Sequence, residues 1–293
     1  MYDGINKIQK GIKMKKYLSI FSLFLFIATL NAQFQQPRVS PQASVSQTFG
    51  YTTITINYSR PSVHNRKIWG ALVPYDKVWR TGANEATTIQ FTTDVTIAGN
   101  KIVAGIYSLF MIPTENSWNV ILNTESKIWG LSHKPENDYL RFSVKPAQSR
   151  FTEQLQFCFS EVTDASCMVL MNWENIQISF VVTSDLASQA YLKMKDAINK
   201  SPQDPSVYNA CVKFAAEKEI FLDEAIDWAD KAVAFGGGYI SYFFKAKIQY
   251  AQKKYVDALR TIEKCREVGR TDKNWESFYS QVDFLEKQIK SSM

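Results

Sequence analysis

The chain has 293 residues, of which 45% are hydrophobic and 21% are charged, and its formal net charge is +6. Five lysines and one aspartate lie in residues 1–32, whereas residues 33–182 and 183–293 each carry a net charge of only +1. The basic excess is therefore confined to the N-terminus, which excludes the basic surface that a nucleic-acid-binding protein needs.

The N-terminus has the pattern of a secretory signal peptide. Three lysines precede the mainly apolar run 17–30, and its 14 residues are too few to span a bilayer comfortably. Small Ala32 follows at the expected cleavage position. We predict that residues 1–32 are a signal peptide and that the rest is exported, to the periplasm or beyond, with no membrane span after cleavage. The alternative is an uncleaved membrane anchor.

Residues 33–182 alternate with the period of β-strands. Ile54, Ile56 and Tyr58 are separated by polar residues, as in a strand with one buried face. Glycine and asparagine in the segment 98–101 predict a tight hairpin turn. Further strands are predicted at 89–91, 95–97, 106–112, 118–123, 140–144, 155–159, 167–171 and 176–182. Short strands without helical periodicity indicate an antiparallel sandwich or barrel.

After residue 183 the apolar period becomes that of α-helices. Helices are predicted at 185–199, 205–218, 222–234, 239–252, 255–268 and 274–290. Similar segments begin at Leu222 and Tyr255, an offset of 33 residues that is close to the tetratricopeptide period. The predicted fold class is α+β with segregated domains: a β-sandwich or barrel at 33–182 and a tetratricopeptide-like helical domain at 183–293. A plain helical bundle is the alternative for the second.

Four cysteines remain after the predicted cleavage, namely Cys158, Cys167, Cys211 and Cys265. Export permits disulfides, but a predicted turn at 163–165 sets the register of the hairpin. In that register Cys158 lies nearer to Met171 than to Cys167, so we expect four buried thiols, with a disulfide as the alternative. No C-x-x-C motif or cysteine–histidine cluster supports a zinc site. We expect no metal and no other cofactor.

The segment between the first two strand runs has the most distinctive motifs. They are Tyr58-Ser59-Arg60-Pro61, Arg66, Ile68-Trp69-Gly70, Val78-Trp79-Arg80-Thr81-Gly82-Ala83-Asn84-Glu85-Ala86-Thr87 and, beyond it, Ala104-Gly105-Ile106-Tyr107-Ser108-Leu109-Phe110. Through them residues 36–182 resemble the DUF2911 family, exported bacterial proteins of unknown function. The resemblance implies an exported β domain, often with repeats behind it, and no established activity. His64 stands where such proteins commonly have lysine, so it is not expected to be a shared functional residue.

The same segment holds the candidate ligand-binding residues: Arg60, Arg66, Trp69, Tyr75, Trp79, Arg80, Asn84 and Glu85. Arginines with a carboxylate and an amide suit a polar ligand or oxyanion. Glu85 is a weak candidate for a general base, if burial raises its pKa. In the structural alternative, Arg66 or Arg80 pairs with Glu85 and the aromatic residues pack in the core instead of forming a stacking platform.

Catalytic motifs are scarce. The chain has only two histidines, no G-x-S-x-G motif and no phosphate-binding glycine loop. The leading hypothesis is a non-enzymatic binding protein of the bacterial cell envelope, with a polar ligand at the arginine-rich loop and a protein or peptide partner on the helices. One alternative is a hydrolase or lyase that acts on a polar, carbohydrate-like substrate through Glu85 with Arg66 or Arg80. The other is a structural envelope component.

Overall fold

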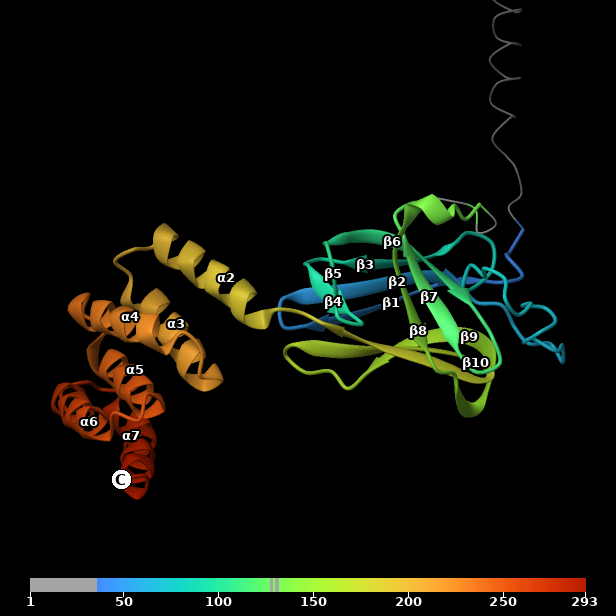
Figure 1. Ribbon diagram of the computed structural model, residues 1–293. Coiled ribbons are helices and arrows are strands. Elements are labelled where there is room, and N and C mark those ends of the chain that lie inside the picture. The colour runs from blue at the N-terminus through green and yellow to red at the C-terminus, as the bar shows by residue number, and fades with distance from the viewer. Residues whose placement is uncertain (1–35, 127–128, 130–131) are drawn as a thin grey trace, which may run out of the picture.

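A computed structural model describes residues 36–126, 129 and 132–293 of the chain. The predicted signal peptide, residues 1–32, lies outside the described residues. Two antiparallel sheets form a β region, and residues 186–291 form six helices beside it (Figure 1). The fold is therefore the segregated α+β arrangement that the change of hydrophobic period predicts.

The β region consists of a six-stranded and a four-stranded sheet, both antiparallel. In spatial order the first contains β1 (Gln42–Phe49), β2 (Thr52–Ser59), β3 (Thr87–Phe91), β6 (Gly105–Ile112), β7 (Trp118–Asn123) and β8 (Asp138–Val144). The second contains β5 (Asn100–Ile102), β4 (Val95–Ile97), β10 (Ser166–Thr183) and β9 (Ala147–Ser160). A short 3-10 helix, η2 (Pro135–Asn137), precedes β8.

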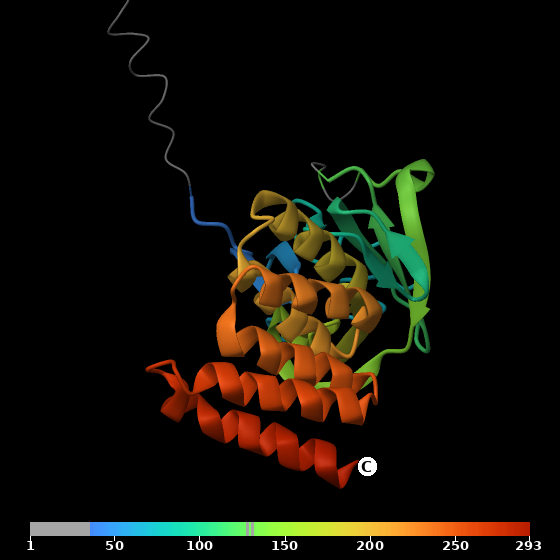
Figure 2. The same cartoon turned by 90° about the vertical axis from the view of Figure 1, so that its left-hand side faces the viewer.

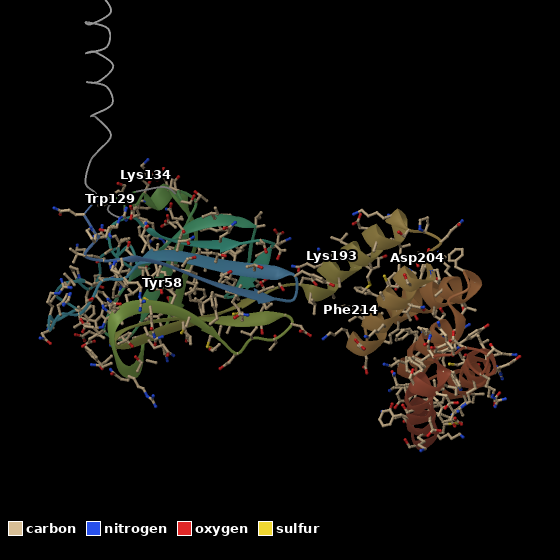
Figure 3. The ribbon with its side chains drawn as sticks, turned by 180° about the vertical axis from the view of Figure 1, so that it is seen from behind. Tyr58, Trp129, Lys134, Lys193, Asp204 and Phe214 are labelled. Carbon is tan, nitrogen blue, oxygen red and sulfur yellow. The ribbon has the colours of Figure 1, made fainter. Side chains whose placement is uncertain are left out.

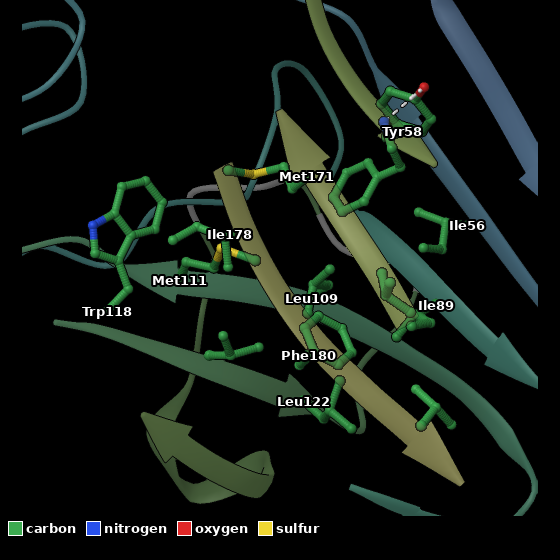
Figure 4. Close-up of a cluster of buried hydrophobic side chains, with 14 of the residues drawn as sticks. Ile56, Tyr58, Ile89, Leu109, Met111, Trp118, Leu122, Met171, Ile178 and Phe180 are labelled. Atoms are coloured by element: carbon green, nitrogen blue, oxygen red, sulfur yellow. Dashed lines mark hydrogen bonds between the residues drawn. The ribbon is translucent and has the colours of Figure 1, made fainter. Parts of the chain in front are cut away.

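The inner faces of the two sheets form one core. On β2 the apolar residues are buried and the polar residues between them are less buried, as the alternation predicts. Figure 4 shows Ile56, Ile89 and Leu109 of the first sheet with Met171, Ile178 and Phe180 of β10. Full burial of one such side chain stabilises a fold by about 1.5–3 kcal/mol. The alternating apolar residues therefore hold the sandwich together.

Four strands differ from the prediction: β5 lies partly within the predicted hairpin turn 98–101, β9 begins at Ala147, ahead of the predicted 155–159, and β1 and β10 differ as follows. The polar edge strand β1 was not expected, because it has too few apolar residues to show a buried face. The predicted strands 167–171 and 176–182 are one long strand, β10, whose pairing with β9 shifts register between Asn172 and Ile176. Such bulges insert extra residues and interrupt the alternation, which makes one strand look like two.

The six helices begin and end within one residue of the predicted bounds. They are α2 (Leu186–Lys200), α3 (Pro205–Lys218), α4 (Leu222–Ala234), α5 (Gly238–Ala251), α6 (Tyr255–Gly269) and α7 (Trp275–Ser291). Asp185 and Asp204 accept hydrogen bonds from the first-turn amides of α2 and α3. After α4, Gly236 has φ +82°, and the amide of Gly237 donates to the carbonyl of Ala232 (3.0 Å). Glycine therefore permits the left-handed end that the sequence predicts.

The helices stack one upon the next, from α2 down to α7 (Figure 2). Helix α5 packs on both α3 and α4, and α7 packs on α5 and α6. Ala225 and Ala258, the small residues of the 33-residue repeat, are fully buried. The tetratricopeptide-like character of this packing remains a prediction. Among the described helices, none has both the length and the apolar character that a membrane span requires.

The two regions meet at the turn between β1 and β2. Tyr51 packs against the helical core, and the Nζ atom of Lys193 lies 5.1 Å from the centre of its ring. Lys218 forms an ion pair with Asp164, beside this turn. Figure 3 shows Lys193 on the side of the helices that faces the sandwich. The segment 60–86 lies at the other end of the sandwich (Figure 1), so the helices leave it uncovered.

Candidate functional site

The loop segment, residues 60–86, joins β2 to β3 and is fixed to the sandwich by backbone hydrogen bonds. The amide of Trp79 donates to the carbonyl of Met111 (2.7 Å), and the amide of Met111 donates back (2.9 Å). On the other sheet, the amide of Val63 donates to the carbonyl of Glu153 (2.8 Å). The loop segment is therefore tied to β6 and β9, and its side chains have defined positions.

Two tryptophans of the loop segment pack with one from β7 and one from β10. Trp69, Trp79, Trp118 and Trp173 are each at most 9% exposed. The rings of Trp69 and Trp118 meet edge to face with centroids 4.7 Å apart, a favoured aromatic geometry. Trp69 and Trp79 therefore lie in the core, as the structural alternative predicts, and do not form an open stacking platform.

The three candidate arginines bond to backbone carbonyl oxygens. Arg60 Nε donates to Leu155 (3.0 Å), and Arg66 Nε donates to Val63 (3.0 Å). Arg80 Nη1 donates to Asn84 (2.9 Å). Among the described residues, no carboxylate lies within 4.0 Å of these three guanidinium groups. The predicted pairing of Arg66 or Arg80 with Glu85 is therefore wrong.

Glu85 pairs instead with Arg38, whose Nη1 lies 2.6 Å from Glu85 Oε2. The Glu85 side chain is 43% exposed, and the hydrogen bond from Arg38 holds its pKa below the ordinary value. A general base for neutral pH needs a raised pKa. The pKa of Glu85 is therefore lowered, whereas the role of general base required burial to raise it. Arg38 was missed because it lies 47 residues away in the sequence.

Asn84 has a structural position. Its φ is +59°, and its Nδ2 atom lies 3.3 Å from both the carbonyl oxygen of Ser40 and the hydroxyl of Ser59. Its own carbonyl accepts the hydrogen bond from Arg80. Asn84 therefore orients Arg80 and ties the segment before β1 to the loop.

A pocket of about 350 Å³ opens beside Arg80. It is lined by Val39, Ser40, Pro61, Ser62, His64, Arg66, Leu72, Val73, Pro74, Lys77, Val78, Trp79, Arg80, Gly82, Ala83 and Trp173. We call it the loop pocket. Arginine and lysine side chains contribute to its wall, and no aspartate or glutamate among the described lining residues does. The nearest carboxylate to the wall's histidine is Glu153, whose Oε1 lies 4.0 Å from His64 Nδ1.

The loop pocket brings together only some of the predicted residues. Arg66, Trp79 and Arg80 line it. The other candidates lie elsewhere: Arg60, Trp69, Tyr75, Asn84 and Glu85. Glu85 lines a separate hollow with Trp129 and Tyr58. Figure 3 labels Trp129 and Tyr58 on the sandwich. Sequence reasoning missed Lys77, Val78 and the β10 residue Trp173, and for Trp173 the only signal was a large aromatic residue between two apparent strands.

A half-buried arginine and a buried tryptophan are the polar groups that set the chemistry of the loop pocket. Burial lowers the pKa of Arg80, because desolvation penalises a guanidinium cation. Trp173 is 1% exposed, and its indole Nε1 has no hydrogen-bond acceptor within the described part of the chain. Guanidinium and indole N–H groups donate hydrogen bonds but accept none. The pocket therefore favours a ligand with acceptor oxygens and negative charge.

The described residues contain no cluster of side chains suited to hold a metal ion. Over residues 36–126, 129 and 132–293, histidine, cysteine, aspartate and glutamate side chains form no group of three or more that suits a metal ion. All four cysteines are free: Cys167, Cys211 and Cys265 are buried, and Cys158 is half-buried. Cys158 pairs across the hairpin with Leu170, as its place beyond the turn requires.

Comparison with known families identifies the β region. Residues 40–182 match a family model described as "Protein of unknown function (DUF2911)". Residues 40–182 therefore belong to the DUF2911 family. The matched segment includes the whole loop segment and ends before the first helix. The match confirms the resemblance that the sequence motifs indicate. A comparison with curated proteins gave no match.

Proposed function

We propose that this DUF2911 protein is an exported, non-enzymatic binding protein of the bacterial cell envelope that holds a small anionic ligand in the loop pocket. Export is supported by the N-terminal sequence pattern. The observation that carries the proposal is that Arg66 and Arg80 line the pocket while bonding only to backbone carbonyls. Their charges have no carboxylate partner among the described residues, so an anion from solution supplies one.

The two arginines are held in place before any ligand arrives. Arg66 donates two hydrogen bonds, to the carbonyls of Ser62 and Val63, and Arg80 is held by Asn84. A guanidinium has a planar set of donors that matches a carboxylate or phosphate group. Because the side chains are already ordered, binding loses less conformational entropy. This arrangement supports recognition of an oxyanion.

The enzymatic alternative has less support. A hydrolase or lyase using Glu85 with Arg66 or Arg80 needs these side chains at one site, but Glu85 faces a different hollow and pairs with Arg38. The third hypothesis, a structural envelope component, explains the tryptophan core. It does not explain why uncompensated cations surround a pocket.

For the helical region we propose a protein or peptide partner. A shallow hollow between α5 and α7 is lined by Phe243, Lys247 and Phe284, and Phe284 is 64% exposed. Exposed aromatic residues of this kind are common at protein interfaces. Phe284→Ser should abolish capture of a partner from envelope extracts, with Tyr279→Ser as the control on the same helix. Equal capture by both variants would contradict this assignment.

The ligand proposal is tested by calorimetric titration of residues 33–293 with small carboxylates, organic phosphates, neutral sugars and amines. Anions should bind, and Arg80→Gln should weaken them about 10- to 100-fold, as expected for loss of a hydrogen bond to a charged group. Arg60→Gln is the matched control, because Arg60 also bonds a backbone carbonyl, that of Leu155 in β9, but does not line the pocket. Failure of every anion, or equal binding by Arg80→Gln, would contradict the proposal.

A further inference from the structure

The wall of the loop pocket is divided between cations and apolar surface. Resting on the proposed anion site, we infer that its ligand is amphiphilic, with an oxyanion head on an apolar chain or ring. A purely inorganic anion would use the arginines and leave the apolar wall without a partner. The composition of the wall therefore favours a ligand that has an apolar part as well as a negative charge.

The apolar part continues from the floor to the mouth of the pocket. Trp79 and Trp173 line the interior, with ring planes 16° apart. At the surface, Val39 is 90% exposed, Leu72 is 45% exposed and Val78 is 41% exposed. Val39 precedes β1, Leu72 and Val78 belong to the loop segment, and all three line the pocket. Exposed apolar residues that gather in this way mark binding sites, whereas isolated ones need no explanation.

The polar part fits the head group. Arg80 uses one hydrogen bond on Asn84, and its other N–H groups donate to no other described residue. The Trp173 side chain lines the same wall, but its indole N–H is closed off from solvent, so the donors open to a ligand are those of the guanidinium groups. Lys77 and Arg66 contribute further positive charge, and the carboxylate of Glu153 lies beside His64 of this wall. An oxyanion head therefore finds donors next to the apolar surface.

The volume limits the size of the ligand. At roughly 30 Å³ for each water-sized group in a liquid, a pocket of about 350 Å³ holds about 12 non-hydrogen atoms. A head group with a chain of about eight carbons, or with a single aromatic ring, fits this volume. A long polysaccharide does not.

The first measurement is a calorimetric series of n-alkyl carboxylates from butyrate to octanoate on the mature chain. Affinity should rise about two- to four-fold for each added methylene, which is the increment for burying a CH₂ group. Octan-1-ol, which lacks the charge, should bind far more weakly than octanoate. Hexyl phosphate compared with heptanoate shows whether the head is a phosphate or a carboxylate. Affinity that does not change with chain length would overturn the inference.

The second measurement uses the apolar rim. The double variant Leu72→Ser/Val78→Ser should weaken octanoate at least ten-fold and leave butyrate nearly unchanged. Val103→Ser is the control, since Val103 is 51% exposed and does not line the pocket. Equal octanoate binding by the rim variant and the wild type would overturn the inference. If Arg80→Gln still weakens every anion in that case, the proposed anion site stands; if no anion binds the wild type, both fail.

Discussion

Trp79 of the loop segment and Trp173 of β10 stack face to face, with ring centroids 5.7 Å apart and planes 16° apart. Trp173 lies where β10 shifts register between Asn172 and Glu174. The next residue after Trp79 is Arg80, so the stacked pair fixes the backbone from which that arginine reaches the pocket. The core thus positions a residue of the binding site.

This stack predicts a large loss of stability on truncation. Trp173→Ala should lower the free energy of unfolding by about 3–5 kcal/mol, because it removes a buried ring and leaves a cavity. Urea denaturation followed by circular dichroism measures the change. Trp129→Ala is the control: Trp129 is 54% exposed, and the variant should differ from wild type by about 0.5 kcal/mol or less. Similar losses in the two variants would contradict the packing account.

The carboxylate of Asp138 predicts a pH-dependent stability. Burial alone raises its pKa, but hydrogen bonds from Asn123, His133 and Arg141 outweigh burial and hold the pKa below the ordinary value of 3.8. Because the folded-state pKa is depressed, the contribution to stability is present above the unfolded pKa. It is lost as the pH falls through the lower folded value.

Asp138→Asn should therefore destabilise the protein by about 2 kcal/mol at pH 7, where a charged acceptor is lost. The difference from wild type should shrink below pH 3.8, as the wild-type carboxyl group itself becomes protonated. Denaturation curves at pH 7 and pH 3 measure both values, with the exposed Asp196→Asn as the control. A difference that is equal at the two pH values would count against the ionised network.

Tyr51 predicts the strength of the contact between the β region and the helices. Tyr51→Ala removes packing on the helical core and the contact with Lys193, a cation–π pair that stabilises by about 0.5–1 kcal/mol at exposed sites. Amides in the β1–β2 turn and the first turn of α2 should then exchange hydrogen several-fold faster. Phe151→Ala, at a residue 57% exposed on β9, should leave them unchanged. Unchanged exchange in Tyr51→Ala would show that the contact is weak.

The cysteines should titrate as thiols with different reactivities. Burial raises the pKa of all four, and that of Cys265 reaches about 12. Because the thiolate is the reactive form, a thiol-specific reagent should label half-buried Cys158 first and Cys265 only after unfolding. Four thiols should titrate in denaturant without a reducing agent. A lower count would reveal a disulfide.

The sequence predicts elements well where the signals are local. The starts of α2 and α3 are set by the N-cap residues Asp185 and Asp204 and by Pro205 in the first turn of α3. These effects act within one helical turn. The loop segment and its arginines were likewise recognisable. Their partners were not, because the contacts of Glu85 with Arg38 and of Trp79 with Trp173 join positions far apart in the chain. Such pairings depend on the tertiary fold, and the bulge in β10 hid Trp173 further.

Arg80 and the apolar wall of the loop pocket are proposed to bind one amphiphilic anion together. A crystal structure of residues 33–293 with 4-iodobenzoate, soaked well above its dissociation constant, tests this directly through the anomalous signal of iodine. The carboxylate should lie within hydrogen-bond distance of Arg80, with the iodinated ring against Trp79, Leu72 and Val78. An ordered ligand at another site, with the loop pocket empty, would contradict the account.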